Sequence, residues 1–314
     1  MNDLDINFPL NKFEKLIIDI GWESLDDWFS FWNNKRNILS IDKYWNNKVN
    51  DDWIWGLALP LLSQAYKFQN NFSDRKIIGI SALPGTGKTT LGKWLEATSL
   101  KLNFKIAVIS IDDFYLPSDE MKLAIKNNPW NVSRGFPGSH SVKLMHEKLL
   151  NWKMNGELNV PVFDKSLRNG LGDRSHWRLD NPDLLILEGW FLGVKPFSNE
   201  ITNQLISTAN LSLQESSYVL KIQNNLNEYL DIWTLIDNIW HLKPLKIEYM
   251  NIWKTNQEKE MFLQKGNALL DEKLSNFLRM LNVSIPHKSF DFIKSYALLL
   301  IDQERNLVEA GLNF

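Results

Sequence analysis

The chain has 314 residues, of which 44% are hydrophobic and 23% charged, with a formal net charge of -2. These proportions are typical of a globular protein with a buried core, and the lack of a basic surplus argues against a general nucleic-acid binder. No cysteine occurs, which excludes disulfides, thiolate nucleophiles and cysteine-ligated zinc. The sequence opens without a signal-peptide pattern, and no apolar run reaches the ~18 residues of a membrane helix, so we expect a cytoplasmic protein.

Residues 1–72 are rich in aromatic side chains, and we expect them to form a helical extension that precedes a second unit, residues 73–314. Trp28, Phe31 and Trp32 have the i, i+3, i+4 spacing of one helix face, and the leucine-rich segment 57–65 predicts another helix. We interpret the aromatic residues as packing residues, with a lid or protein contact as the alternative. The tryptophans of this region are Trp22, Trp28, Trp32, Trp45, Trp53 and Trp55.

Short apolar runs then alternate with helical stretches. This alternation predicts an α/β fold, with a mainly parallel five-stranded sheet covered by helices on both faces. The segment from Trp253 to Leu281 predicts two helices that meet near Gly266, and they form either a nucleotide lid or further scaffold. The five predicted strands are Ile77–Ser81, Ile106–Ser110, Leu184–Leu187, Tyr218–Ile222 and Leu298–Ile301.

The sequence from Ala82 to Thr89, ALPGTGKT, follows the first predicted strand and precedes a helical stretch, as a Walker A phosphate loop does. Its glycines let backbone N–H groups converge on phosphate oxygens, and the following helix adds its positive end. We expect Lys88 to neutralise the phosphates of ATP and Thr89 to offer its hydroxyl to Mg²⁺. The expected nucleotide-binding residues are Pro84, Gly85, Thr86, Gly87, Lys88, Thr89 and Thr90.

Two other predicted strands end in carboxylates, at the edge where open α/β sheets bind ligands. Glu188 ends one of them and is the expected Walker B residue, which holds Mg²⁺ directly or through water. Asp112 and Asp113 follow another, where a carboxylate can orient an acceptor hydroxyl and accept its proton, although aspartates also cap turns. Neighbouring side chains of an extended chain point to opposite sides, so only one aspartate is expected to face the acceptor.

Two loops are candidates for acceptor binding, Arg134–His140 and Phe163–Arg174. Cations gather in and after the second loop, where they either grip a carboxylate or form a solvated surface. These cations are Lys165, Arg168, Arg174 and Arg178. The histidines show no metal-ligand spacing; His140 is a candidate substrate contact, and His146, His176, His241 and His287 are interpreted as packing or surface residues.

The segments PGTGKTT, SIDDFYL, RGFPGSH, PVFDKS…GLGDR and LEGWFLG together resemble the D-glycerate 3-kinases of plants and cyanobacteria. These belong to a P-loop kinase group that includes uridine kinase, phosphoribulokinase and pantothenate kinase. The resemblance covers about residues 75–310. It implies that ATP and D-glycerate give 3-phosphoglycerate and ADP, with Mg²⁺, which in a plant or cyanobacterium is the last step of the photorespiratory return to carbon fixation.

The resemblance also implies roles for single residues. It selects Asp112 as the aspartate that activates the acceptor. The second expected catalytic residue is the phosphate-loop lysine, Lys88. The positions expected to line the glycerate pocket are Arg134, His140, Asp164, Lys165 and Arg174.

The chain departs from the family pattern in four places. Ser141 and Phe163 stand where aspartate and tyrosine are expected, and Lys254 and Phe262 stand where the lid is expected to carry arginines. Two alternatives stay open: a kinase of another small acceptor, such as a nucleoside or pantothenate, and a nucleotide-binding regulatory protein without turnover. The expected partners are ATP and a small substrate, with no nucleic acid and no membrane.

Overall fold

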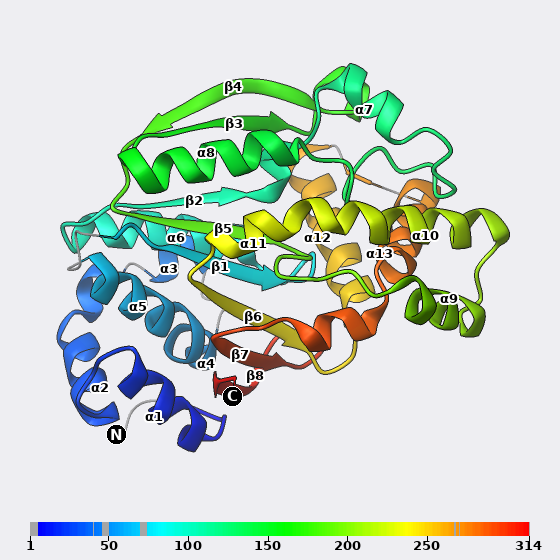
Figure 1. The fold of residues 1–314 in the computed structure, drawn as a ribbon. Coiled ribbons are helices and arrows are strands. Elements are labelled where there is room, and N and C mark those ends of the chain that lie inside the picture. Colours follow the sequence, from blue (N-terminus) through cyan, green and yellow to red (C-terminus); the bar gives the residue numbers. More distant parts are fainter. Residues whose placement is uncertain are drawn as a thin grey trace.

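The computed structural model describes residues 6–39, 41–45, 50–69, 74–266, 268–269 and 271–313. At its centre lies a six-stranded sheet in the order β2-β5-β1-β6-β7-β8, in which β8 alone is antiparallel to its neighbour. Helices cover both faces, so the predicted α/β fold with a mainly parallel sheet is confirmed (Figure 1). The strands are β1 Ile77–Ala82, β2 Ile106–Ser110, β5 Leu184–Gly189, β6 Asn238–Pro244, β7 Ala297–Ile301 and β8 Leu307–Leu312.

One predicted strand is wrong. Tyr218–Ile222 lies inside helix α10, Leu213–Leu226, and the remaining parallel strand is β6. Ser212 and Glu215 form a capping box that starts this helix, and its residues Tyr218, Ile222 and Leu226 recur every four positions on a buried face. A short apolar run does not by itself separate a buried strand from a buried helix turn, and the capping pair decides the case here.

The N-terminal helices and the phosphate-loop helix share one apolar cluster with one face of the sheet, while a second cluster fills the other face (Figure 1). The first face carries α1 Leu10–Asp19, α2 Leu25–Asn34, α5 Leu59–Gln69 and α6 Lys88–Lys101. The second carries α8 Val142–Asn155, α10, α11 Leu230–Leu235 and α13 Asp271–Ser284. Among the described residues, no helix is both long and apolar enough to cross a membrane.

The remaining elements are short, apart from α9 and α12. A two-stranded antiparallel hairpin, β3 Leu158–Asp164 and β4 Asp173–Asp180, lies outside the main sheet and packs on α8 and η3. The others are η1 Arg36–Ile38, α3 Ile41–Trp45, α4 Asp51–Trp53, the π-helical η2 Ile54–Ala58, η3 Ile111–Phe114, α7 Ser118–Ala124, η4 Arg168–Gly170, α9 Asn199–Thr208, η5 Asn227–Tyr229, α12 Tyr249–Lys265 and η6 His287–Phe292.

The aromatic N-terminal region packs as predicted, because Trp28 and Trp32 are fully buried on one face of α2. Both indole N–H groups donate to the hydroxyl oxygen of Ser63 in α5, each over 2.8 Å. The predicted boundary between residues 72 and 73 lies outside the described residues, and the division of the chain at that point stays a prediction.

Both ends of the described chain lie near β8, at one edge of the sheet (Figure 1). Lys12 in α1 forms an ion pair of 2.9 Å with Glu309 in β8. Gly311 lies so close to α1 that an added Cβ would come within 2.5 Å of the Lys12 Cβ. Strand β8 therefore depends on α1 for part of its cover.

We expect Ser63→Ala to destabilise the protein strongly, although the substitution removes only one oxygen atom. It leaves two buried indole donors unpaired, each of which costs about 1–3 kcal/mol. The free energy of unfolding from urea titration measures the effect. Ser207→Ala is the matched control, because Ser207 lies on an exposed part of helix α9 and bonds only to the Gln204 carbonyl. Equal stability of the two variants would contradict the expectation.

Candidate active site

The phosphate loop connects β1 to α6, as the sequence predicts. Gly85 and Gly87 have φ values of 84° and 97°, a region that favours glycine. The Lys88 ammonium donates to the carbonyls of Ala82 at 2.7 Å and Leu83 at 3.1 Å. Burial lowers the pKa of Lys88, although the nearby Glu188 carboxylate opposes that shift. The loop therefore holds its lysine inside the curl of its own backbone.

The other predicted nucleotide-binding residues lie around this curl. Thr86 is buried and donates its hydroxyl to the Leu83 carbonyl over 2.9 Å, which braces the loop. Thr89 is exposed in the first turn of α6. Pro84 and Thr90 are half-buried on either side of the two glycines.

Glu188 lies one residue before the end of β5 beside the phosphate loop, because β5 pairs with β1 in parallel register and sets Glu188 next to Ile80. Its Oε2 lies 3.9 Å from the Lys88 ammonium. Burial raises the pKa of Glu188, and Lys88 counters the rise. Glu188 and Thr89 are suitable Mg²⁺ ligands, since this ion takes oxygen ligands and is commonly held by one or two protein groups plus substrate phosphates.

Asp112 and Asp113 lie in η3, a 3₁₀ turn, so the argument from an extended chain is wrong. The two side chains are nevertheless separated. Asp113 accepts the Ser110 backbone N–H over 2.9 Å as part of a capping box, and burial raises its pKa to about 6. Asp112 instead accepts the Lys165 ammonium over 2.7 Å. Burial would raise the pKa of Asp112, but Lys165 and His140 outweigh it and hold the pKa well below its usual range.

Lys165 reaches Asp112 from the turn that follows β3. Asp164 shapes this turn, because its carboxylate accepts both the backbone N–H and the hydroxyl of Ser166, over 2.8 and 2.6 Å. The Lys165 side chain is 57% exposed. Partial desolvation opposes protonation of Lys165, but the Asp112 carboxylate raises its pKa overall. A charged ammonium that is half-exposed and bonded to Asp112 therefore lies at the predicted acceptor position.

The rest of the predicted basic cluster does not converge on that position. Arg168 pairs with Asp173 at 3.1 Å, and Arg178 pairs with Glu96 at 2.9 Å. Arg174 donates to the Ser141 hydroxyl over 2.6 Å, while its buried Nε has no hydrogen-bond partner. Of the cluster, only Lys165 contacts Asp112.

Arg134 lies close enough to Lys165 that its positive charge opposes protonation of Lys165 and lowers the pKa of that lysine. It binds the carbonyls of Gly170 and Leu171 at 2.9 and 2.7 Å, so in this structure it fixes the loop between β3 and β4.

His140 lies between two tyrosines that sequence reasoning did not assign. Its ring stacks on Tyr115 with centroids 4.5 Å apart, and its Nδ1 lies 2.8 Å from the Tyr229 hydroxyl. Burial lowers the pKa of His140 to about 4, so the imidazole is neutral at pH 7. Its Nε2 is buried without a hydrogen-bond partner, which leaves one ring nitrogen available to a ligand. Tyr115 belongs to the SIDDFYL segment, and Tyr229 begins the segment YLDIWTLIDNIWHLKP, which also resembles the family but gave Tyr229 no role.

The predicted helix pair is confirmed as α12 and α13, and Gly266, with φ 68°, directly follows the end of α12. Helix α12 lies directly on the phosphate loop, since a Cβ added to Gly85 would come within 2.7 Å of the Trp253 Cβ. Lys254 points inward, where it pairs with the buried Glu258 and acts on Lys88. Phe262 is 46% exposed, so only one of the two lid departures faces the site.

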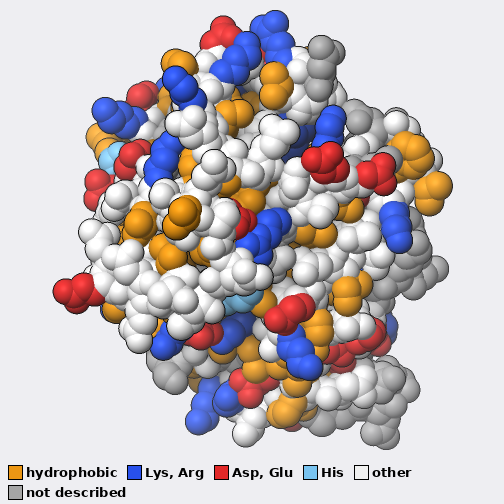
Figure 2. Space-filling model, turned by 90° about the vertical axis from the view of Figure 1, so that its right-hand side faces the viewer, with side chains coloured by type: hydrophobic (Ala, Val, Ile, Leu, Met, Phe, Trp, Pro, Cys, Tyr) orange, Lys and Arg blue, Asp and Glu red, His pale blue; other side chains and the backbone are white. Residues whose placement is uncertain are grey.

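Arg305, in the turn between β7 and β8, is a further contact that sequence reasoning missed. It donates to the Gly85 carbonyl over 3.1 Å. Figure 2 looks onto the side of the molecule toward which β1 and β2 point, and there basic and acidic side chains are interspersed around a central hollow.

No protein-family model matches the chain. D-glycerate 3-kinase from Cryptococcus neoformans var. grubii superposes with a TM-score of 0.69 at 23% identity, covering 81% of this chain and 99% of that one, and thereby shows the fold. Chloroplastic D-glycerate 3-kinase of Arabidopsis thaliana is 31% identical over 217 residues, 64% of this chain and 45% of that protein. The kinase mug58 of Schizosaccharomyces pombe is 31% identical over 214 residues, 64% of this chain and 76% of that protein. The chain belongs to the same kinase family as mug58.

Members of this family are P-loop kinases, so the chain is an ATP-dependent kinase of that group. The kinase brings together a phosphate-loop lysine, a strand-end glutamate and an aspartate at the C-terminal ends of three adjacent strands, β1, β5 and β2. This arrangement suits direct transfer of a phosphoryl group to a hydroxyl bound above Asp112.

Proposed function

We propose that the kinase phosphorylates D-glycerate to 3-phosphoglycerate with ATP. One observation carries the proposal beyond the family: the Asp112 carboxylate is bonded to the Lys165 ammonium, on the acceptor side of Lys88 and Glu188. An acceptor that carries both a hydroxyl and a carboxylate matches this pair, because the hydroxyl bonds to the aspartate and the carboxylate to the lysine.

The proposed reaction is a direct in-line transfer. The acceptor hydroxyl oxygen forms a bond to the γ-phosphorus, the bond from that phosphorus to the bridging oxygen of ADP breaks, and the hydroxyl proton passes to Asp112. Positioning and electrostatic stabilisation supply most of the rate in such reactions. Lys88 stabilises charge on the phosphates from inside the loop, and Lys254 of α12, which is paired with Glu258, lies close enough to influence the charge of Lys88.

Thr89 and Glu188 would hold Mg²⁺ in this proposal. When bound, the ion neutralises charge on the β- and γ-phosphates. Among the described residues no group of three or more histidine, aspartate or glutamate side chains forms a metal site. A Mg²⁺ ion that relies on substrate phosphates needs no such group.

Lys165 also tunes Asp112 in this mechanism. While the ammonium is bonded to Asp112, the carboxylate is a weak proton acceptor, since its pKa lies well below the usual range. A bound substrate carboxylate would share the ammonium, and Asp112 would regain affinity for a proton. An acidic substrate therefore promotes its own reaction, whereas a neutral alcohol leaves Asp112 tied to Lys165.

An ADP-release assay with a panel of acceptors tests the proposal. We expect D-glycerate to be used far better than glycerol, uridine or pantothenate, and ³¹P NMR of the product to show 3-phosphoglycerate. Preference for uridine or pantothenate would overturn the substrate assignment. ATP binding without turnover on any acceptor would favour a regulatory protein.

We expect Lys165→Met to abolish the preference for an acidic acceptor. Loss of a hydrogen bond to a charged group costs about 1.5–3 kcal/mol, so kcat/KM for glycerate should fall roughly 10- to 100-fold. The value for glycerol should not fall and is expected to rise, because the variant removes the ammonium that holds the pKa of Asp112 down.

Arg168→Met is the matched control, since it removes a cation from the same loop that pairs with Asp173 rather than Asp112. It should keep the glycerate preference. If both variants lose glycerate and glycerol activity in equal proportion, the loop acts through its shape rather than through the Lys165 charge.

A further inference from the structure

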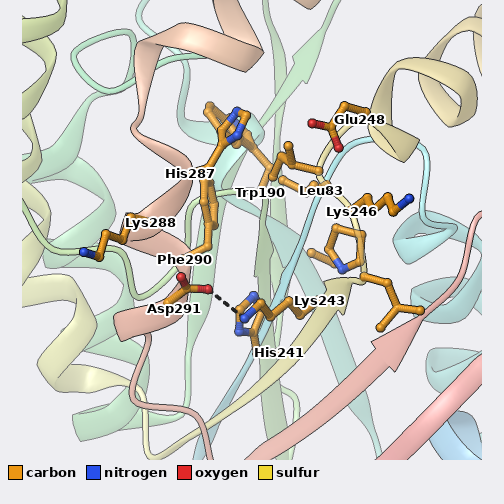
Figure 3. Close-up of a pocket in the computed structure, with 14 residues that line it drawn as sticks. Leu83, Trp190, His241, Lys243, Lys246, Glu248, His287, Lys288, Phe290 and Asp291 are labelled. Carbon is orange, nitrogen blue, oxygen red and sulfur yellow. Dashed lines mark ion pairs between the residues drawn. The ribbon is translucent and has the colours of Figure 1, made fainter. Parts of the chain in front are cut away.

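A cavity of about 450 Å³ lies behind the phosphate loop, between the end of β6, the start of α12 and η6 (Figure 3). This volume falls in the usual range for small-molecule pockets, about 300–1,000 Å³. None of the residues predicted to bind nucleotide, metal or acceptor lines it. Its walls include Leu83, Trp190, His241, Lys243, His287 and Phe290.

Two buried polar side chains lie side by side at this place, and one of them has no partner among the described residues. His241 is 4% exposed and lines the cavity. Ser81 is its neighbour in the register of β1 and β6, and the Ser81 hydroxyl is buried without a partner. Buried polar groups are nearly always hydrogen-bonded, so an unpartnered hydroxyl next to a histidine that lines a cavity indicates a site for a polar ligand.

The charges around the cavity favour an anion. Lys243 is partly neutralised by Asp291 at 2.7 Å, whereas Lys246 and Lys288 pair with no carboxylate in the part of the chain that the structure describes. In Figure 3 these two lysines lie on opposite sides of the lining residues, with their ammonium groups pointing outward. Glu248 is the other acidic residue of the lining, so three lysines face two carboxylates.

The neutral form of His241 suits this role. Burial, aided by Lys243, lowers the pKa of His241 to about 4, so near pH 7 the ring offers one donor and one acceptor. The 17-residue helix α12 also begins at the cavity, and its N-terminal end is positive. Trp190 and Phe290, whose ring centroids lie 6.1 Å apart, supply an aromatic wall.

We propose that this cavity binds a small organic anion, a carboxylate or phosphate ester with a flat apolar body, at a site separate from the active site. Ala82 and Leu83 line the cavity, and their carbonyls accept the Lys88 ammonium on the other side. A ligand in the cavity therefore contacts the two residues that hold the phosphate-loop lysine. The inference does not depend on the substrate, because binding is measured without turnover.

Histidine NMR tests the proposal directly, since the chain has only five histidines. The full chain, labelled with ¹³C at histidine Cε1, is titrated with benzoate, phenyl phosphate and the neutral match benzyl alcohol. We expect at least one of the two anions to shift the His241 and His287 signals saturably, with little change at His176 on β4. Comparison of benzoate with phenyl phosphate distinguishes a carboxylate site from a phosphate site.

Charge variants locate the interaction. Lys246→Ala combined with Lys288→Ala should weaken anion binding about tenfold or more, as expected for lost charge-assisted hydrogen bonds. Lys294→Ala, an exposed lysine outside the lining, should leave it unchanged. The proposal is overturned if neither anion shifts His241, if benzyl alcohol binds equally well, or if only the His140 signal moves.

Discussion

Asp112→Asn is expected to lower kcat by roughly 10²–10⁴, the usual contribution of a positioned general base. Asparagine keeps the size of the side chain and can still accept a hydrogen bond from Lys165, but it cannot take the hydroxyl proton. ATP affinity should stay close to that of the unmodified protein, because Asp112 lies on η3 and not in the phosphate loop. The measurement is kcat at saturating ATP and glycerate, with a thermal melt of the variant.

Asp113→Asn is the matched control, one residue further along the same turn. Its side-chain oxygen still accepts the Ser110 backbone N–H, so the cap and the turnover should both survive. If Asp113→Asn has a strongly reduced kcat and Asp112→Asn a nearly normal one, the general base is Asp113 and the assignment is off by one residue. If both variants have a nearly normal kcat, the acceptor is oriented from elsewhere, and the loop that carries Asp164 becomes the next candidate.

Lys88→Ala is expected to remove most of the turnover while the fold persists. Loss of one preorganised group that stabilises transition-state charge costs about 10²–10³ in kcat, and Lys88 also supports ATP binding. The glycine turns and the Thr86 bond to Leu83 still shape the loop in this variant. Turnover and ATP affinity, measured separately, give the two contributions.

Lys93→Ala removes an exposed lysine from the same helix and is the control for charge and helix propensity. It should keep normal turnover and a normal melting temperature. Near-normal ATP-dependent activity of Lys88→Ala would mean that the phosphate loop has been assigned wrongly.

The parts of the fold that follow from local sequence were predictable. The strand before the phosphate loop, the loop itself and the strand that carries Glu188 are each specified within a few neighbouring residues. β6 was missed because its sequence, NIWHLKP, mixes polar residues with apolar ones. His241 and Lys243 lie in this strand and both line the cavity. The polar residues that made the strand hard to recognise in the sequence therefore also form part of the proposed anion site.

The site was harder to predict where partners come from distant segments. Arg178 looks like a fourth substrate cation in the sequence, but Glu96, which neutralises it, lies 82 positions away on another element. His140 was a candidate from its motif, whereas Tyr229, which fixes its ring, lies 89 positions away. Such long-range pairs are set by tertiary packing and leave no mark in a single sequence.

The contact between α1 and β8 has a consequence for the order of synthesis. Lys12 and Glu309 are 297 positions apart, so the helix emerges from the ribosome long before the strand that it covers. Chains grow at about 5–20 residues per second, and the apolar face of α1 must wait some tens of seconds for its last partner. Phe13, Leu16 and Ile17, fully buried in the finished protein, are therefore the surface that a chaperone would shield on the nascent chain.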